Sequence, residues 1–443
     1  MVGKTDEESM RQLIITNVGP ITQTATIDYE RFCILIGPQS NGKSTIAKVL
    51  STCLWLEKEA CTSLSTDVIK DGNDFKRLVE DFHRMHNYIH PDSSVIEYRS
   101  PFVTIIYDKG NFSLSFSDNL SYNRLKISYV PSDRNIVTMK DIEKRDMEPT
   151  NFRSFLFDWL DTNRHYDSQH KASILNLGIK YYFKAEAKDR RDMLTHENGV
   201  TYDIPLYDAS SGMQSLVPMT VLMHYLTTDY FRNYGTDLSY EQEQKRISLS
   251  WAVAREITEK HYPEEVKHKD YKDVYNELIK VKAGENNPVA VGAMVEMKKL
   301  FEQFSKPQGI SFILEEPEQN LFPQTQVDLF NDIVSLCNAG HPSNVFVTTH
   351  SPYLLAAANI LLFTGKLKSM GVSSQQVEEL SGTRASIQND EFSAYSVSDG
   401  TCCSIIDQQT GLIKENELDS ASDYNAEVFD RLYQLYIQKL RSK

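Results

Sequence analysis

One short segment of the chain has the residue types and spacing of a loop that holds phosphate groups. It reads Gly37-Pro38-Gln39-Ser40-Asn41-Gly42-Lys43-Ser44 and fits G-x-x-x-x-G-K-[ST] without a gap. The glycines allow backbone angles that let the loop N–H groups turn toward phosphate oxygens. Lys43 is expected to reach the β- and γ-phosphates, and the Ser44 hydroxyl to bind Mg²⁺. The predicted nucleotide-binding residues are Gly37, Gln39, Ser40, Asn41, Gly42, Lys43, Ser44 and Thr45.

Adjacent carboxylates follow an apolar run near residue 310. Residues 309–314 have the composition of a buried strand, and Glu315-Glu316-Pro317-Glu318 comes directly after them. Beside a phosphate loop, a first carboxylate (Glu315) holds the Mg²⁺ shell and a second (Glu316) polarises the attacking water. A strand with an ordinary acidic turn is the alternative, and the phosphate loop favours the catalytic interpretation.

Two further segments carry groups that suit a nucleotide site. His350 follows the apolar run 344–349, so it lies at a strand's carboxyl end, where it can contact a γ-phosphate. Residues 210–215 are small or polar and precede an apolar run, which predicts a helix start with free N–H groups. A structural histidine and an ordinary capped loop are the alternatives.

Strands that end at one edge of a sheet would bring these groups together. The runs 33–36, 309–314 and 344–349 are short and apolar, as in strands buried on both faces. Residues 45–54 have apolar side chains at helical spacing. This alternation predicts an α/β head with a mainly parallel sheet core.

Composition limits the classes of protein that the chain can represent. Its net charge of −14 over 443 residues argues against a surface built for nucleic acid, although a local basic patch stays open. Its six cysteines show no C-x-x-C spacing and are expected to be reduced thiols. The polar, acidic N-terminus does not resemble a signal peptide, and no apolar run reaches the length of a membrane span. A cytoplasmic protein without membrane association is predicted.

The four segments together resemble the ATP-binding-cassette (ABC) class of ATPases. The resemblance places Ser211-Gly212-Met213-Gln214 at the signature motif, with Met213 where a second glycine is usual. It implies that Ser211, Gly212 and Gln214 complete the ATP site of another subunit, so that the chain acts as a homo-oligomer, at least a dimer. It makes Glu316 the catalytic glutamate and His350 the switch histidine. Glu315 departs from the usual aspartate.

Spacing resembles the OLD-, RecF- and SMC-like branch more than transporter ATPases. Ser211 lies 168 residues after Lys43 (211 − 43) and 105 before Glu316 (316 − 211), whereas a transporter signature directly precedes the acidic strand. Residues 319–323 also lack the usual D-loop aspartate. The segment 129–135 falls at the Q-loop but has no glutamine, and either Arg134 or Asp133 is expected to take a polar role there.

Within that branch, the motifs resemble stand-alone bacterial ATPases of anti-phage systems such as PARIS and Septu. The resemblance implies a regulatory, Mg²⁺-dependent ATPase with a separate effector, a nuclease or toxin, and a phage-encoded trigger. The alternatives are a DNA-repair or chromosome-associated ATPase that binds DNA directly, and a transporter ATPase. The tail has no Toprim-type acidic set, so we expect no nuclease in this chain.

The ATPase head is expected to be interrupted by insertions and followed by a tail. The head is predicted at 1–59, 98–139 and 306–370, the signature segment at 199–224, and insertions at 60–97 (helical), 140–198 and 225–305 (helical). In the tail, 371–443, a hairpin across Asp399-Gly400 should join strands 392–397 and 404–407, followed by a helix with Val428, Leu432, Leu435, Tyr436 and Leu440. The basic run 184–191, which includes Lys184, Lys188, Arg190 and Arg191, is interpreted as a solvated helix face, with an acidic partner as the alternative.

Overall fold

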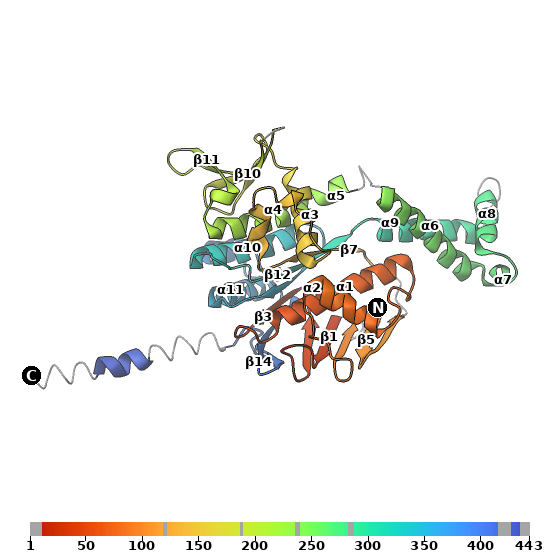
Figure 1. The fold of residues 1–443 in the computed structure, drawn as a ribbon, viewed down its shortest axis with the longest axis horizontal. Coiled ribbons are helices and arrows are strands. Elements are labelled where there is room, and N and C mark those ends of the chain that lie inside the picture. The colour runs from red at the N-terminus through yellow and green to blue at the C-terminus, as the bar shows by residue number, and fades with distance from the viewer. Residues whose placement is uncertain are drawn as a thin grey trace, which may run out of the picture.

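A six-stranded sheet lies at the centre of the chain (Figure 1). The computed structural model describes residues 11–117, 122–186, 189–234, 240–281, 288–414 and 427–434. The strand order is β15-β14-β3-β13-β12-β7, and every neighbouring pair is parallel except β14 with β15. The strands are β3 (Phe32–Ile36), β7 (Leu125–Val130), β12 (Gly309–Glu315), β13 (Ser343–Thr348), β14 (Phe392–Ser398) and β15 (Thr401–Ser404).

The central strands are buried on both faces, as their unbroken apolar runs predict. Every residue of β3 and of β12 is buried. Because these strands run parallel, their carboxyl ends meet at one edge of the sheet. The phosphate loop, the Glu315-Glu316 pair and His350 therefore all leave the sheet at that edge. The prediction of an α/β head with a mainly parallel core is confirmed.

A second sheet, which the sequence did not reveal, is antiparallel and has the order β2-β1-β4-β5-β6. Its strands are β1 (Arg11–Thr16), β2 (Ala25–Tyr29), β4 (Val95–Arg99), β5 (Val103–Asp108) and β6 (Asn111–Phe116). Helix α1 (Lys43–Ser63) shares one buried cluster with this sheet and with alternate residues of β3, so it is enclosed between the two sheets. Helix α2 (Gly72–His83) is capped by Asp71, whose side chain accepts from the N–H groups of Asn73 and Asp74.

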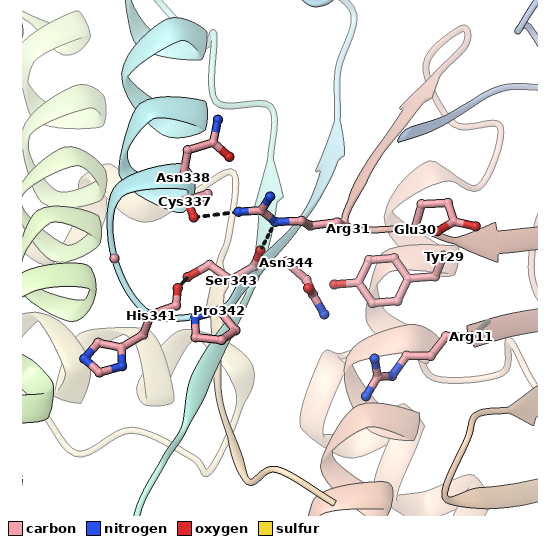
Figure 2. Close-up of a pocket in the computed structure, with 11 residues that line it drawn as sticks. Arg11, Tyr29, Glu30, Arg31, Cys337, Asn338, His341, Pro342, Ser343 and Asn344 are labelled. Atoms are coloured by element: carbon pink, nitrogen blue, oxygen red, sulfur yellow. Dashed lines mark hydrogen bonds between the residues drawn. The ribbon is translucent and has the colours of Figure 1, made fainter. Parts of the chain in front are cut away.

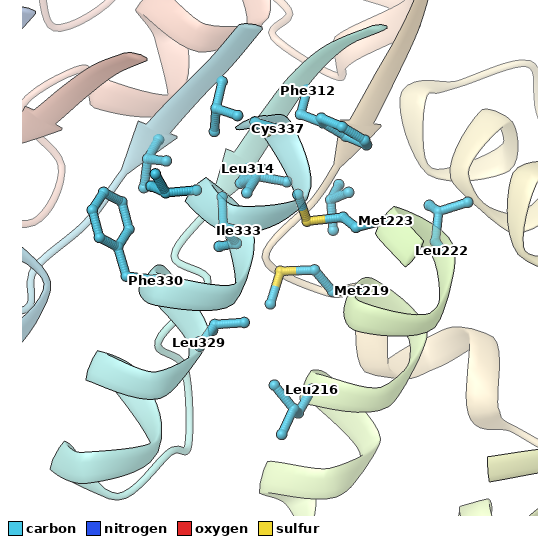
Figure 3. Packing of buried hydrophobic residues seen from close by; sticks show 14 of the residues in the cluster. Leu216, Met219, Leu222, Met223, Phe312, Leu314, Leu329, Phe330, Ile333 and Cys337 are labelled. Carbon is cyan, nitrogen blue, oxygen red and sulfur yellow. The ribbon is translucent and has the colours of Figure 1, made fainter. Parts of the chain in front are cut away.

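Helices cover the other face of the central sheet. They are α3 (Asn151–Asn163), α4 (Ser211–Thr228), α10 (Pro323–Ala339) and α11 (Pro352–Ser369). Figure 3 shows the side chains of α4 and α10 meeting over β12, with Met219 and Met223 directed toward Ile333 and Leu314. Within the described residues there are four short 3-10 helices: η2 (Arg134–Thr138), η3 (Ile142–Lys144), η4 (Leu206–Asp208) and η5 (Asn389–Glu391).

The interpretation of the basic run 184–191 as a helix face is wrong. A small sheet of order β11-β10-β9-β8 contains this run, with β8 (Ala172–Ser173), β9 (Ile179–Glu186), β10 (Asp189–His196) and β11 (Tyr202–Pro205). Strands β9 and β10 pair as an antiparallel hairpin, and Tyr181 and Leu194 of its core face are buried. Lys188 lies outside the described residues.

Residues after α4 form a helical arm, in the region 225–305 where a helical insertion was predicted. Its helices are α5 (Tyr230–Asn233), α6 (Tyr240–His261), α7 (Pro263–Val266), α8 (Tyr271–Val281) and α9 (Pro288–Ser305). Helices α6, α8 and α9 project away from the head in Figure 1. None of the helices in the described part of the chain has the length and apolar character that a bilayer crossing requires.

The tail contributes a strand to the central sheet. Its hairpin turns through Asp399 and Gly400, both at positive φ, so β15 starts at Thr401, earlier than the predicted second strand at 404–407. Strand β14 pairs in parallel with β3. A further helix, α12 (Ser374–Ser381), precedes the hairpin. Residues 427–434 are helical, whereas Leu435, Tyr436 and Leu440 lie outside the described residues.

Met219→Ala should lower the free energy of unfolding by about 2–5 kcal/mol, because it leaves a cavity between α4, α10 and the sheet. Urea unfolding measures the change. Leu380→Ala is the matched control, since Leu380 is exposed and its truncation should cost less than about 0.5 kcal/mol. Equal effects of the two substitutions would contradict the described packing.

Candidate functional site

The phosphate loop joins the end of β3 to the start of α1 and needs glycine at both ends. Gly37 and Gly42 have φ of 139° and 100°. A Cβ on Gly37 would lie 2.1 Å from the carbonyl oxygen of Val397, and one on Gly42 would lie 2.6 Å from Cδ1 of Ile21. The first collision is with backbone and leaves no room for a side chain at Gly37, whereas the second is with the end of a flexible side chain, so Gly42 is required by its conformation.

Lys43 is held at the centre of this loop. Its ammonium group donates to the carbonyl oxygens of Gly37 and Pro38, each at 2.8 Å. Burial lowers the pKa of Lys43, and the negative charges of Glu316 and Glu318 oppose that shift. Gly42 gives α1 no side-chain cap, which leaves the N–H groups of its first turn for an anion.

The other predicted loop residues lie around Lys43 with different exposure. Gln39 and Ser40 are exposed, Asn41 and Ser44 are half-buried, and Thr45 is buried at the start of α1.

Glu315 presents a carboxylate oxygen suited to a cation. The side chain is buried, and its Oε2 accepts a hydrogen bond from the Ser132 N–H at 3.2 Å. Its Oε1 is buried with no hydrogen-bond partner, and so is the hydroxyl of Thr348, the residue paired with Glu315 in the neighbouring strand. An unpaired buried carboxylate oxygen is costly, and a divalent cation would satisfy it. Glu315 therefore fits a divalent cation such as Mg²⁺.

Glu316 and His350 face each other at the carboxyl ends of β12 and β13. Their Oε1 and Nε2 atoms are 3.6 Å apart. The nearby His350 ring lowers the pKa of Glu316, and burial opposes this shift, so the carboxylate is charged at neutral pH. Glu316 has a φ of 43°, a left-handed conformation that is strained for a residue with a side chain. A backbone turn in this conformation needs stabilising contacts from the residues around it.

Arg134 supplies that restraint from η2. Its guanidinium is completely buried and donates to five backbone carbonyl oxygens. The acceptors are Glu315 (2.9 Å), Glu316 (2.9 Å), Pro317 (3.2 Å), Pro131 (3.3 Å) and Ser215 of α4 (3.0 Å). Burial lowers the pKa of Arg134 to about 10, and the nearby glutamates oppose the shift, so the group stays protonated. We call Arg134 and its five hydrogen bonds to backbone carbonyl oxygens the arginine brace.

The polar role expected near residue 134 thus belongs to Arg134. It acts on backbone carbonyls at the end of β12, in the turn after it and in α4. Asp133 instead lies at the surface, where it pairs with Arg84 at 3.4 Å.

Glu318 is a residue that sequence reasoning missed. Its Oε1 accepts from the Thr349 hydroxyl and from the His350 N–H, both at 2.7 Å. Burial raises the pKa of Glu318, while these two hydrogen bonds oppose the shift. Glu318 therefore ties the turn after β12 to the loop that carries His350. The sequence signal for Glu318 was its position two residues after Glu316. The turn after β12 folds back over the strand ends, which brings a residue at this position close to the loop that carries His350.

The predicted signature segment begins α4, as expected. Ser210 caps the helix by accepting from the Met213 N–H, and Ser211 is exposed in the first turn. A Cβ on Gly212 would lie 2.7 Å from the carbonyl oxygen of Asn320, so the helix start packs against the turn after Glu318. The Gln214 amide nitrogen donates to the carbonyl oxygens of Tyr207 and Ala209, which fixes the loop before the helix.

A separate pocket lies at the opposite edge of the central sheet and gathers none of these residues (Figure 2). Its volume is about 420 Å³, and its guanidinium groups are already engaged. Arg31 donates to the carbonyl oxygens of Ser343 and Cys337 and to Glu391, and Arg11 pairs with Glu57.

Solved structures resemble this chain in fold, but the comparisons by sequence found no match. No protein-family model matches the chain, and no curated protein matches it. The SMC head domain from Thermotoga maritima is 10% identical, with 90% of this chain and 98% of that chain covered at a TM-score of 0.34. The Smc head from Pyrococcus furiosus, bound to the C-terminal domain of ScpA, is 9% identical (95% and 99% covered, TM-score 0.35). The cassette MJ1267 of an ABC transporter is 10% identical (89% and 90% covered, TM-score 0.24).

The fold is assigned from the strand order and from the position of the site residues in this structure. A parallel sheet brings a phosphate loop, an acidic strand end and a histidine to one edge, with an antiparallel sheet across α1 and a capped helix start at Ser211. This is the α/β architecture of an ABC-ATPase head.

Proposed function

We propose that the chain is a Mg²⁺-dependent ATPase whose sites form between copies of the chain. The observation that carries the proposal is the convergence of Lys43, Glu315, Glu316 and His350 at one sheet edge. The loop N–H groups and Lys43 bind the phosphates of ATP, and Ser44 and Glu315 hold the metal ion. When bound, Mg²⁺ neutralises charge that develops on the phosphate oxygens.

Glu316 is the group that acts on the attacking water. Its lowered pKa keeps it ionised, so it can accept a hydrogen bond from water and take its proton. As the bond from the water oxygen to the γ-phosphorus forms, the bond from that phosphorus to the β–γ bridging oxygen breaks, and ADP and phosphate leave. His350, 3.6 Å away, orients this carboxylate and contacts the γ-phosphate. Arg134 is a positioning residue, because all five of its hydrogen bonds go to backbone carbonyl oxygens, including that of Glu316.

Exposure of Ser211 supports a site completed by a second copy. Its hydroxyl lies at the surface in the first turn of α4, where the helix N-terminus favours an anion. In the proposed dimer, Ser211 and Gly212 of one copy contact the γ-phosphate held by Lys43 of the other. ATP joins the heads and hydrolysis releases them.

The biological role that we propose is regulation of a partner effector, a nuclease or toxin, in an anti-phage complex. Support comes from the motif resemblance and from the insertions, which add surface without further catalytic motifs. A DNA-binding repair ATPase is the second candidate, and the net charge of −14 disfavours it.

Glu316→Gln should lower turnover about 10²- to 10⁴-fold, because the amide cannot draw a proton from water. ATP binding should persist, and light scattering with ATP and Mg²⁺ should show accumulated joined heads. Lys43→Ala is the comparison variant, since it should lose both hydrolysis and tight binding. Turnover at the parent rate in Glu316→Gln would exclude this residue as the catalytic carboxylate.

Arg134→Lys should lower turnover about 10²-fold while ATP binds normally, because an ammonium group cannot reach five carbonyls and Glu316 loses its position. The phosphate loop makes no contact with Arg134, so nucleotide affinity separates a positioning role from general unfolding. Arg84→Lys, in an exposed pair, is the control and should retain the parent rate. Unchanged turnover in folded Arg134→Lys would contradict the role of the arginine brace.

Mixing Ser211→Arg copies with Lys43→Ala copies should restore hydrolysis that neither variant has alone. A mixed dimer holds one site with both lesions and one with neither. With random mixing, about a quarter of the parent rate should return. Failure to recover in verified mixed dimers would place the whole site within one chain.

A further inference from the structure

The helical arm carries an apolar groove that the ATPase site does not use. Its volume is about 280 Å³. Side chains of α6, α8 and α9 line it: Trp251, Val253, Tyr275, Met294, Met297 and Phe301.

Exposed apolar side chains extend the groove along two helices. Ile247 lies one turn before Trp251 on α6, and Val291 and Val295 lie on the stripe of α9 that leads to Lys298. Val295 is 65% exposed. Contiguous apolar surface of this kind marks a site for another protein segment.

The rim of the groove is positively charged. The Lys272 ammonium lies 5.4 Å from the centre of the Trp251 ring, and the Arg246 guanidinium lies 5.7 Å from the Phe301 ring. Lys298 lines the groove itself. A complementary segment therefore has apolar side chains flanked by carboxylates.

The end of this same chain has that chemistry. In helix 427–434, Phe429 and Leu432 lie three residues apart on one face and are 67% and 61% exposed. From residue 415 to 430 the sequence has six acidic residues and no lysine or arginine. Arg431 pairs with Glu427, which leaves Asp430 as the carboxylate between the two apolar residues.

The position of the tail indicates a second copy as its source. Asn359 of α11 bonds Ile413 in both directions, so the tail leaves the head beside α11. In Figure 1 this point lies on the side of the head opposite the arm. We propose that the arm groove of one copy binds helix 427–434 of a second copy, which rests on the proposed homo-oligomer but not on ATP hydrolysis.

Photo-crosslinking of the full-length protein tests this contact. A photoreactive benzoyl-phenylalanine replaces Leu432, and ¹⁵N-labelled and unlabelled copies are mixed in equal amounts. Mass spectrometry should find tail peptides of one isotope joined to α6 or α9 peptides of the other. The same probe in place of Tyr202, which is exposed on β11, should give no crosslinks to the arm.

Two sets of variants sharpen the test. Trp251→Glu should reduce the crosslink yield about tenfold, because a charge would enter an apolar groove, whereas Phe157→Glu, at an exposed aromatic residue of α3, should not change it. Asp430→Lys should reduce the yield about two- to fivefold, and adding Lys298→Glu should restore it. Recovery by charge exchange requires the two residues to meet.

Crosslinks confined to single chains, crosslinks to other surfaces, or a yield unaffected by Trp251→Glu would each overturn the proposal. ATP hydrolysis is measured in the same samples. Loss of hydrolysis with intact arm crosslinks would count against the proposed function alone, and normal hydrolysis without arm crosslinks against this inference alone.

Discussion

The edge of the central sheet where Glu315, Glu316 and His350 lie depends on one buried guanidinium. Arg134 bonds the backbone of three segments that are distant in sequence: the end of β7, the turn after β12 and the first turns of α4. Each carbonyl left without a partner would cost about 1–3 kcal/mol. The same cation also lies among Glu315, Glu316 and Glu318, whose negative charges it offsets. One side chain thus sets the shape of the turn and part of its electrostatics.

Apolar packing positions the strands of this head, and polar hydrogen bonds position the turns beyond the strand ends. Strands β3, β12 and β13 are positioned by buried apolar side chains on both faces, which fix where each strand ends. Beyond those ends the backbone is irregular, and apolar contacts no longer determine its course. There Arg134 holds Glu316, and Glu318 holds the loop of His350, so that the 3.6 Å approach of Glu316 to His350 follows from two buried polar residues.

The central strands and the start of α4 could be predicted because local pattern determines them. The apolar runs that end at Gly37, Glu315 and His350 must be buried, because exposing them to water would be unfavourable. The antiparallel sheet β2-β1-β4-β5-β6 was not predicted. The sequences of its strands do not indicate that one face of the sheet packs against α1. In the run 184–191, alanine alternates with charged residues only as far as residue 187, and the last four residues are all charged. Only the pairing partner of this run distinguishes a strand from a helix. The direction of the Arg134 side chain is a tertiary property, and the assigned roles of Lys43, Glu316, His350 and Ser211 stay predictions.

The pairing of β3 with β14 has a consequence for synthesis. The strand that begins the phosphate loop emerges early from the ribosome, whereas its neighbour Phe392–Ser398 is made near the end. At cellular elongation rates the delay is roughly 20–70 s. Throughout that interval one edge of β3 lacks its partner, and Gly37 lacks the Val397 carbonyl against which it packs. A nascent or prematurely ended chain therefore presents an open strand edge beside an unfinished loop, which makes it a substrate for chaperones and proteases until β14 is in place.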